Sequence, residues 1–299
     1  EGPDQRELTM AGIKELRLRI KSVGNIKQIT RAMEMVSTTK LRRFQDRAIA
    51  SRPYADEIAG LVGRLAGELG EDLNDRPLFQ QGKGEKVLCL VVSSDRGLCG
   101  AYNTNVFRKL EAWKAEQTEE VEFFTIGKKA EAYLKTNGHV NKHDIIDPPL
   151  EQMDYRSAAV VAGMLVKAFE SGEYKSVWIL GTDFVSMARY VPRAAQFLPI
   201  EAGALGAGDE KVGGDVILEP SAGEIFDALV PRYLETQIYN MTLESLTSEY
   251  ASRRFAMKNA TEAANDMQAL LKGMYNRKRQ EGITTELLDI VGGAAAVAS

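Results

Sequence analysis

The segment Ser93–Asn103 (SSDRGLCGAYN) is the first part of the chain whose residue types and spacing suggest chemistry. It is a glycine-containing turn that follows an apolar run and opens into a helical stretch, a position at which α/β proteins often bind phosphate. The segment has neither the G-x-G-x-x-G pattern nor the Lys-Ser/Thr pair of a P-loop. We therefore interpret it as a tight structural turn, and keep a nucleotide-binding α/β enzyme as an alternative.

Two histidines have a spacing that can bind metal. His139 and His143 are four residues apart, so a helix would place both on one face. Gly138 before them and Asp147–Pro149 after them predict a loop instead. We expect a solvated pair of histidines and no metal site.

The remaining reactive side chains show no catalytic arrangement. Cys99 lies near Arg96, which can lower the pKa of a thiol, but no histidine or acid pattern marks it as a nucleophile. We expect an inert or interface cysteine. Acids such as Asp95, Asp144 and Asp183 form no recognisable acid–base pair. The sequence thus predicts no catalytic residue, no metal ligand and no cofactor.

The charge near the amino end is strongly uneven. Between Lys14 and Arg52 there are 11 Lys or Arg against 3 acids, although the whole chain has a net charge of −4. The basic flank consists of Lys14, Arg17, Lys21, Arg31, Lys40, Arg42, Arg43 and Arg47. It is either a solvated helix face or a docking surface for an acidic partner. A basic coiled-coil protein that binds nucleic acid is an alternative, which the acidic total charge does not favour.

Composition places the chain among folded proteins. It has 299 residues, of which 44% are hydrophobic and 27% charged. Two cysteines, Cys89 and Cys99, make no disulfide framework, so we expect a reducing compartment. No apolar run approaches the roughly 20 residues that span a bilayer. Met10 looks like a natural start, and Glu1–Thr9 like an extension.

Long helices are predicted at both ends of the chain. Apolar residues recur at helical spacing from Ile13 to Val36, and again from Leu234 to Ile290. Pro53 predicts a kink or brief interruption before helix resumes to about Leu69. The second stretch would be roughly 60 residues and about 90 Å long, which no compact domain requires. We infer that the two helices pair as an antiparallel coiled coil.

The middle of the chain reads as alternating strands and helices. Three β-rich apolar runs lie at 86–92, 121–126 and 176–180, separated by helical stretches at 104–116, 128–137 and 156–171. This order predicts a mostly parallel sheet. We expect a loop at 202–214 and a further edge strand at 215–218. The predicted fold is α/β: a coiled-coil helix at 10–70, a Rossmann-like α/β domain inserted at 86–220, and a second coiled-coil helix at 224–299.

Several blocks of the sequence resemble the γ subunit of F-type ATP synthases, and the likeness covers nearly the whole chain from Met10. The blocks are ITRAMEMVSTTK at 29–40 followed by Leu41 and Arg42, SSDRGLCGAYN at 93–103, SEYASRRFAMKNA at 248–260, and YNRKRQEGITTELLDIVGGAAAV at 275–297. They occur in the order found in the family.

The resemblance implies a non-catalytic rotor shaft. In that family the coiled coil enters a hexameric head of α and β subunits, and the α/β domain rests on the ring of c subunits and contacts the ε subunit. Ion-driven rotation of the ring then changes the nucleotide affinity of each β subunit in turn. The resemblance also implies peripheral association with a membrane. Because the cysteine-bearing chloroplast insertion looks absent, we expect the cytoplasmic face of a bacterial inner membrane, with an organellar membrane as the alternative.

The resemblance assigns coupling and interface roles to individual residues. Met33 falls in the helix facing the head, and Arg253, Gln280, Thr284 and Glu286 fall in the blocks that couple rotation to catalysis. Arg96 and Cys99 match the turn that meets an acidic segment of β, for which Arg42, Arg43 and Arg47 offer counter-charge. Glu219 matches the part that touches the ring.

Overall fold

The computed structural model describes residues 5–142, 148–201, 205 and 219–298. The elements are α1 (Gln5–Leu69), η1 (Gly70–Asp75), η2 (Pro77–Phe79), β1 (Lys86–Val92), α2 (Tyr102–Ala115), β2 (Val121–Ile126), α3 (Lys128–Thr136), η3 (Leu150–Gln152), α4 (Tyr155–Glu170), β3 (Tyr174–Ser186), β4 (Arg189–Leu198) and α5 (Ala222–Ala298). They form two compact units: one contains the chain up to Val36 and from Arg254 onward, and the other contains Ser37–Arg253. The predicted α/β fold with long terminal helices is confirmed.

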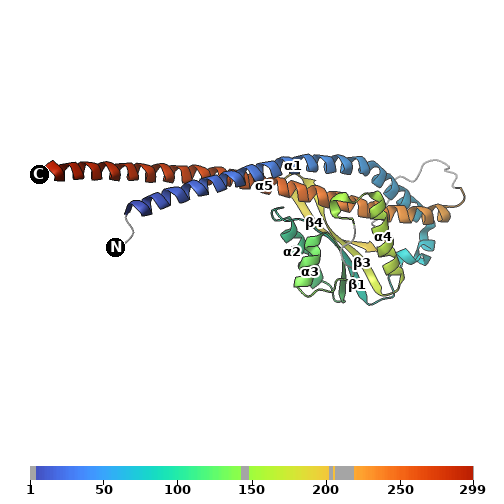
Figure 1. The fold of residues 1–299 in the computed structure, drawn as a ribbon. Coiled ribbons are helices and arrows are strands. Elements are labelled where there is room, and N and C mark those ends of the chain that lie inside the picture. The colour runs from blue at the N-terminus through green and yellow to red at the C-terminus, as the bar shows by residue number, and fades with distance from the viewer. Residues whose placement is uncertain (1–4, 143–147, 202–204, 206–218, 299) are drawn as a thin grey trace. The chain divides into compact units, whose positions relative to one another are not determined.

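The larger unit is built on a four-stranded sheet with the order β2-β1-β3-β4 (Figure 1). The strands β2, β1 and β3 are parallel, with Leu88 opposite Glu122 and Val177. Crossovers through α2, α3 and α4 connect the parallel strands, as the alternating pattern predicts. The carboxyl ends of these strands therefore lie together at one edge of the sheet.

Helices cover both faces of this sheet. Along β1, Val87, Cys89 and Val91 pack on the cluster that contains residues of α2 and α3. Leu88 and Leu90 point the other way and join a larger cluster with α4 and with the parts of α1 and α5 that belong to this unit. Because both faces are buried, β1 has no polar face, and its continuous apolar run is typical of a central parallel strand.

Strand β4 was not predicted. It pairs antiparallel with β3, which extends from Tyr174 to Ser186 rather than over 176–180. Pro192 interrupts the sequence pattern of a strand. However, β4 is an edge strand, and edge strands tolerate proline because one of their sides needs no N–H donor for strand pairing. The expected strand at 215–218, and most of the loop expected at 202–214, lie outside the described residues.

The predicted interruption of α1 at Pro53 is wrong, because the helix continues to Leu69. Pro53 and Ile49, whose carbonyl has no N–H partner at position 53, are both exposed, so the lost hydrogen bond lies on the solvent side of the helix. Phe44 and Ile58, on either side of it, are buried in the larger cluster and hold both halves of the helix against the unit.

The smaller unit pairs the first part of α1 with the last part of α5. Arg17 Nη2 donates to the hydroxyl of Tyr275 over 3.0 Å, and Thr261 Oγ1 donates to Thr30 Oγ1 over 2.8 Å. The contact residue with the higher number on α1 pairs with the one with the lower number on α5, so the two helices are antiparallel. The predicted antiparallel pairing is confirmed. Within the described residues, no helix is both long and apolar enough to span a bilayer.

A buried carboxylate stabilises the amino ends of the strands. Glu122 on β2 is 4% exposed and accepts hydrogen bonds from Lys86 Nζ (2.7 Å) and the Tyr174 hydroxyl (2.6 Å). Lys142 Nζ lies 3.3 Å away. Burial raises the pKa of Glu122, but the hydrogen bonds from Lys86, Tyr174 and Lys142 outweigh it and lower the pKa to about 2.

This cluster predicts acid sensitivity. The pKa of Glu122 is below the unfolded value of about 4.3, so its stabilising contribution is present above that pH and is lost as the pH falls toward 2. We expect Glu122→Gln to lower the urea midpoint at pH 7, and the difference from wild type to shrink at pH 3. The exposed Glu57→Gln is the control. A difference that does not depend on pH would contradict this role for the Glu122 carboxylate.

Candidate functional site

The turn after β1 is held together by its own side chains. Ser94 Oγ donates to the carbonyl of Arg96 over 2.8 Å. Asn103 Nδ2 lies 2.7 Å from Ser94 Oγ and 3.2 Å from Cys99 Sγ. Leu98 has a φ of 61°, which is rare for a leucine, and its side chain is 64% exposed. The prediction of a tight structural turn agrees with this geometry.

Helix α5 occupies the space beyond this turn. Ser252 Oγ donates to the Cys99 carbonyl over 2.6 Å, and Arg253 Nη2 donates to the carbonyls of Arg96 (3.2 Å) and Gly97 (3.3 Å). In open α/β sheets, ligands bind outside the carboxyl ends of the strands. Here the chain's own helix contacts the turn at that position, which argues against the nucleotide-binding alternative.

Arg253 is paired with a buried acid one helical turn earlier. Its Nη1 donates to Glu249 Oε1 over 2.6 Å, and the two side chains are 8% and 7% exposed. Burial raises the pKa of Glu249 to about 7, although Arg253 acts to lower it. The ring of Tyr250 lies 5.0 Å from the guanidinium carbon. Glu249 therefore has a pKa within the physiological range.

A second charged pair lies beside the first. Lys40 on α1 pairs with Glu151 of η3, whose other oxygen accepts a hydrogen bond from the Tyr250 hydroxyl over 2.7 Å. Arg47 on α1 donates to the Met153 carbonyl over 3.2 Å. Two cations of the basic flank are thus engaged within the larger unit, whereas Arg42 and Arg43, between them in sequence, are exposed.

The structure brings together three of the residues singled out from the sequence. Arg96, Cys99 and Arg253 form one site, in which Arg96 is exposed and the other two are buried. The others do not join it: Met33 is half-buried in the smaller unit, and Arg42, Arg43, Glu219, Gln280, Thr284 and Glu286 are exposed. Sequence reasoning missed Glu249, Ser252 and Glu151. Only the i, i+4 spacing of Glu249 and Arg253 could have indicated one of them.

The prediction of a solvated histidine pair is wrong for His139, whose side chain is 8% exposed. Its Nε2 lies 2.9 Å from Glu111 Oε1 and its Nδ1 lies 2.7 Å from Lys114 Nζ. The backbone after α3 folds back, and His139 N donates to the Leu134 carbonyl, which turns the ring inward. His143 lies outside the described residues. Among the residues that are described, no cluster of potential metal ligands occurs.

Both cysteines are buried and free. Cys89 is in the middle of β1, and burial raises the pKa of its thiol. Cys99 is 2% exposed and its carbonyl is bound by Ser252. Of the two interpretations offered for Cys99, burial favours the inert one.

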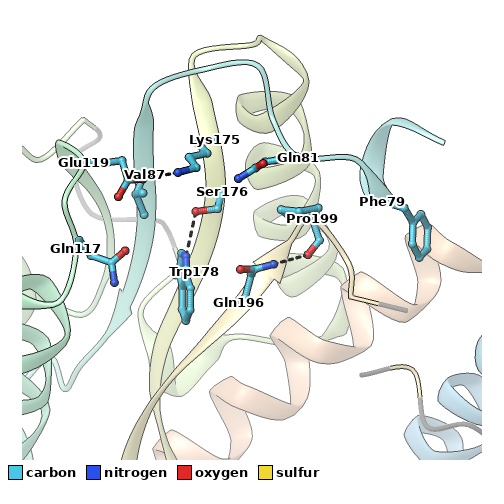
Figure 2. A pocket seen from close by; sticks show the side chains of 10 residues that line it. All are labelled: Phe79, Gln81, Val87, Gln117, Glu119, Lys175, Ser176, Trp178, Gln196 and Pro199. Atoms are coloured by element: carbon cyan, nitrogen blue, oxygen red, sulfur yellow. Dashed lines mark hydrogen bonds and ion pairs between the residues drawn. The ribbon is translucent and has the colours of Figure 1, made fainter. Parts of the chain in front are cut away.

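A hollow of about 380 Å³ lies at the opposite, amino-terminal edge of the sheet (Figure 2). It is lined by Phe79, Gln81, Val87, Gln117, Glu119, Lys175, Ser176, Trp178, Gln196 and Pro199. Figure 2 shows its polar groups bound to one another: Trp178 Nε1 donates to Ser176 Oγ, Gln196 Nε2 donates to the Pro199 carbonyl, and Lys175 pairs with Glu119. These contacts fix the sheet edge and place no nucleophile beside a base.

The last part of α5 has exposed apolar side chains along its length and on several sides of the helix, called here the exposed apolar row. They are Phe255, Met267, Leu270, Met274, Ile283, Leu287, Leu288, Ile290 and Val291, each between 49% and 67% exposed. Among the described side chains of this helix in the smaller unit, Met257, Ala264 and Leu271 are the buried ones. Exposed apolar area on this scale is typical of a surface that another protein covers.

Comparison with known proteins identifies the family. The family model described as ATP synthase matches residues 12–297. The ATP synthase gamma chain of Cytophaga hutchinsonii is 40% identical over 296 residues, covering 96% of this chain and 99% of that protein. The corresponding chain of Geobacter metallireducens is 37% identical over 291 residues, with the same coverage. A chain in the Euglena gracilis mitochondrial ATP synthase (OSCP/F1/c-ring) shares the fold, with a TM-score of 0.68 at 22% identity, covering 96% of this chain and 95% of that one. The chain therefore belongs to the ATP synthase gamma-chain family.

Proposed function

We propose that this chain is the central rotor shaft of a rotary ATP synthase and couples ion-driven rotation of a c-ring to catalysis on other subunits. The observation that carries the proposal is the exposed apolar row on α5 from Met267 to Val291. An exposed apolar surface of this extent marks a site that another protein covers. A head of α and β subunits that encloses the helix would supply that cover.

The residues of the larger unit support contacts with further subunits. Arg42, Arg43 and Arg96 are exposed cations that suit an acidic segment of β, and Glu219 is exposed and suits the polar surface of a c-ring. The solved relative from Euglena gracilis is described as part of an F1 and c-ring assembly. We propose that residues 10–70 and 224–299 act as the shaft, and that residues 86–220 contact the ε subunit and the ring.

The proposed mechanism requires no chemistry on this chain. A shaft that contacts three β subunits differently biases each toward a different nucleotide affinity, and rotation exchanges these contacts in order. The chain must then transmit torque between its two units, which favours a firm link between α5 and the α/β fold. The bonds from Ser252 and Arg253 to the turn after β1 provide such a link.

We propose the cytoplasmic face of a bacterial inner membrane as the location, with peripheral attachment through the complex. The bacterial relatives support this choice. Fractionation of cells with and without the c subunit tests it. The chain is expected with the membranes only when the ring is present, and an unchanged distribution would contradict attachment through the ring.

Reconstitution tests the function. The chain is expressed with matching α and β subunits, and ATP hydrolysis of the purified assembly is measured with and without it. We expect a single copy per hexameric head and a marked rise in hydrolysis. Failure to associate, with hydrolysis indifferent to the chain, would overturn the proposal; nucleic-acid binding that falls steeply with salt would then favour the alternative function.

A further inference from the structure

The guanidinium of Arg253 is enclosed by acceptors from two parts of the larger unit. Glu249 Oε1 on α5 lies 2.6 Å from Nη1, and the carbonyls of Arg96 and Gly97 lie 3.2 and 3.3 Å from Nη2. Arg253 is 6% exposed. Because a guanidinium is planar, fixing one nitrogen pair fixes the direction of the others. The bond to Glu249 therefore sets where Arg253 meets the turn.

Side chains of the turn next to these two carbonyls are exposed to solvent. Leu98 follows Gly97 directly, with a φ of 61° and a 64% exposed side chain, and Arg96 is also exposed. A leucine keeps such a backbone conformation only where the surrounding contacts enforce it. Here those contacts are the bonds from Arg253 and the bond from Ser252 to the Cys99 carbonyl.

Charged and titratable groups from several elements influence Glu249. Arg253 on the same helix lowers its pKa, while Asp95 of the turn and Glu151 of η3 raise it. Tyr250 on α5 and Tyr102 on α2 are also electrostatically coupled to it. Burial is the largest influence and raises the pKa to about 7. The ionised form, which holds Arg253 by a charge-assisted bond, thus predominates above neutral pH.

We propose that Glu249 is a positioning residue for rotary coupling: it orients Arg253 so that the guanidinium holds the Arg96 and Gly97 carbonyls, and so sets how Arg96 and Leu98 are presented to a partner subunit. This inference rests on the proposed function for its consequence, but not for the local hold on the turn.

The reactivity of the two cysteines can be used to measure how firmly Arg253 holds the turn, and this measurement does not require ATP hydrolysis. Cys99 lies in the turn and Cys89 in the middle of β1, and both are buried. Opening of the turn exposes Cys99 to a thiol reagent, whereas Cys89 reacts only after the sheet unfolds. In the full chain at pH 8, we expect Glu249→Gln to raise the labelling rate of Cys99 relative to that of Cys89 about tenfold, because one charge-assisted hydrogen bond is lost. The exposed Glu262→Gln is the matched control and should change neither.

Rescue by a conservative variant separates a positioning role from a merely structural one. Glu249→Asp keeps a carboxylate one helical turn before Arg253, whereas Glu249→Gln removes the charge. We expect the relative labelling of Cys99 to be high in Glu249→Gln and closer to the wild-type value in Glu249→Asp.

The last measurement is the number of ions pumped per ATP hydrolysed by the assembly in vesicles. We expect Glu249→Gln to lower this ratio while ATP hydrolysis persists, with Glu262→Gln at the wild-type value. Equal rises of Cys99 and Cys89 labelling, no rescue by Glu249→Asp, or an unchanged pumping ratio despite faster Cys99 labelling would each overturn the proposal. If the wild-type chain does not assemble at all, the proposed function fails, while the labelling still decides the role of Glu249 in the turn.

Discussion

Replacing Gly127 by alanine is expected to lower the free energy of unfolding by more than about 3 kcal/mol, a large part of the usual margin of about 5–15 kcal/mol. Gly127 follows β2 with a φ of 99°, which L side chains rarely adopt. An added Cβ would lie 2.1 Å from the Ser93 carbonyl oxygen, a backbone atom that cannot rotate away.

The substitution would also disturb the turn after β1. Ser93 N donates to the Ile126 carbonyl over 2.8 Å, and Ala130 N donates to Ser93 Oγ over 2.7 Å. These bonds join the carboxyl ends of β1 and β2 to the start of α3. Moving Ser93 to relieve the clash would break them and would disturb the segment that Arg253 binds.

The matched control is Gly163→Ala in α4. Gly163 has no atom within 4 Å of an added Cβ and lies in the interior of a helix, so alanine should stabilise the chain by about 0.5–1 kcal/mol. Urea denaturation of both variants, followed by circular dichroism, checks the pair. A Gly127→Ala variant within about 1 kcal/mol of wild type would show that the backbone relaxes more easily than this geometry permits.

The elements that the sequence predicted well are those defined by local periodicity. The helical spacing from Ile13 to Val36, the apolar run of β1 and the strand–helix alternation each depend on neighbouring residues only. The structure reproduces them within a few residues. Strand β4 was missed because Pro192 is unusual in a strand. Proline is acceptable there because β4 is an edge strand that pairs with β3 on one side and with no strand on the other.

The candidate site was predicted only in part, because its contacts are long-range. The turn at Ser93–Asn103 was identified from its glycines and position, but its bond to Arg253 joins residues 157 positions apart. Nothing in the local sequence around His139 indicates its burial against Glu111, 28 residues earlier. Pairings of this kind follow from how the helices pack on the sheet, which periodicity does not specify.

The largest functional effect is expected at the exposed apolar row of α5. Leu270 and Met274 are four residues apart, on one face of the helix, and are 66% and 52% exposed. Replacing both by aspartate should leave the stability of the isolated chain nearly unchanged, because neither side chain is buried in it. In the proposed assembly each would be covered by the head, where a buried Leu or Met contributes about 1.5–3 kcal/mol.

Burying two unpaired carboxylates adds a further cost, so the double variant should lose more than about 4 kcal/mol of association free energy, or about a thousandfold in affinity. The measurements are co-purification with α and β subunits and ATP hydrolysis of the product. Asn265→Asp with Asn276→Asp introduces the same charge at exposed polar positions of this helix and should have a much smaller effect. If the apolar pair tolerates aspartate as well as the asparagine pair does, the head does not enclose this row, and the observation that carries the rotor-shaft proposal loses its force.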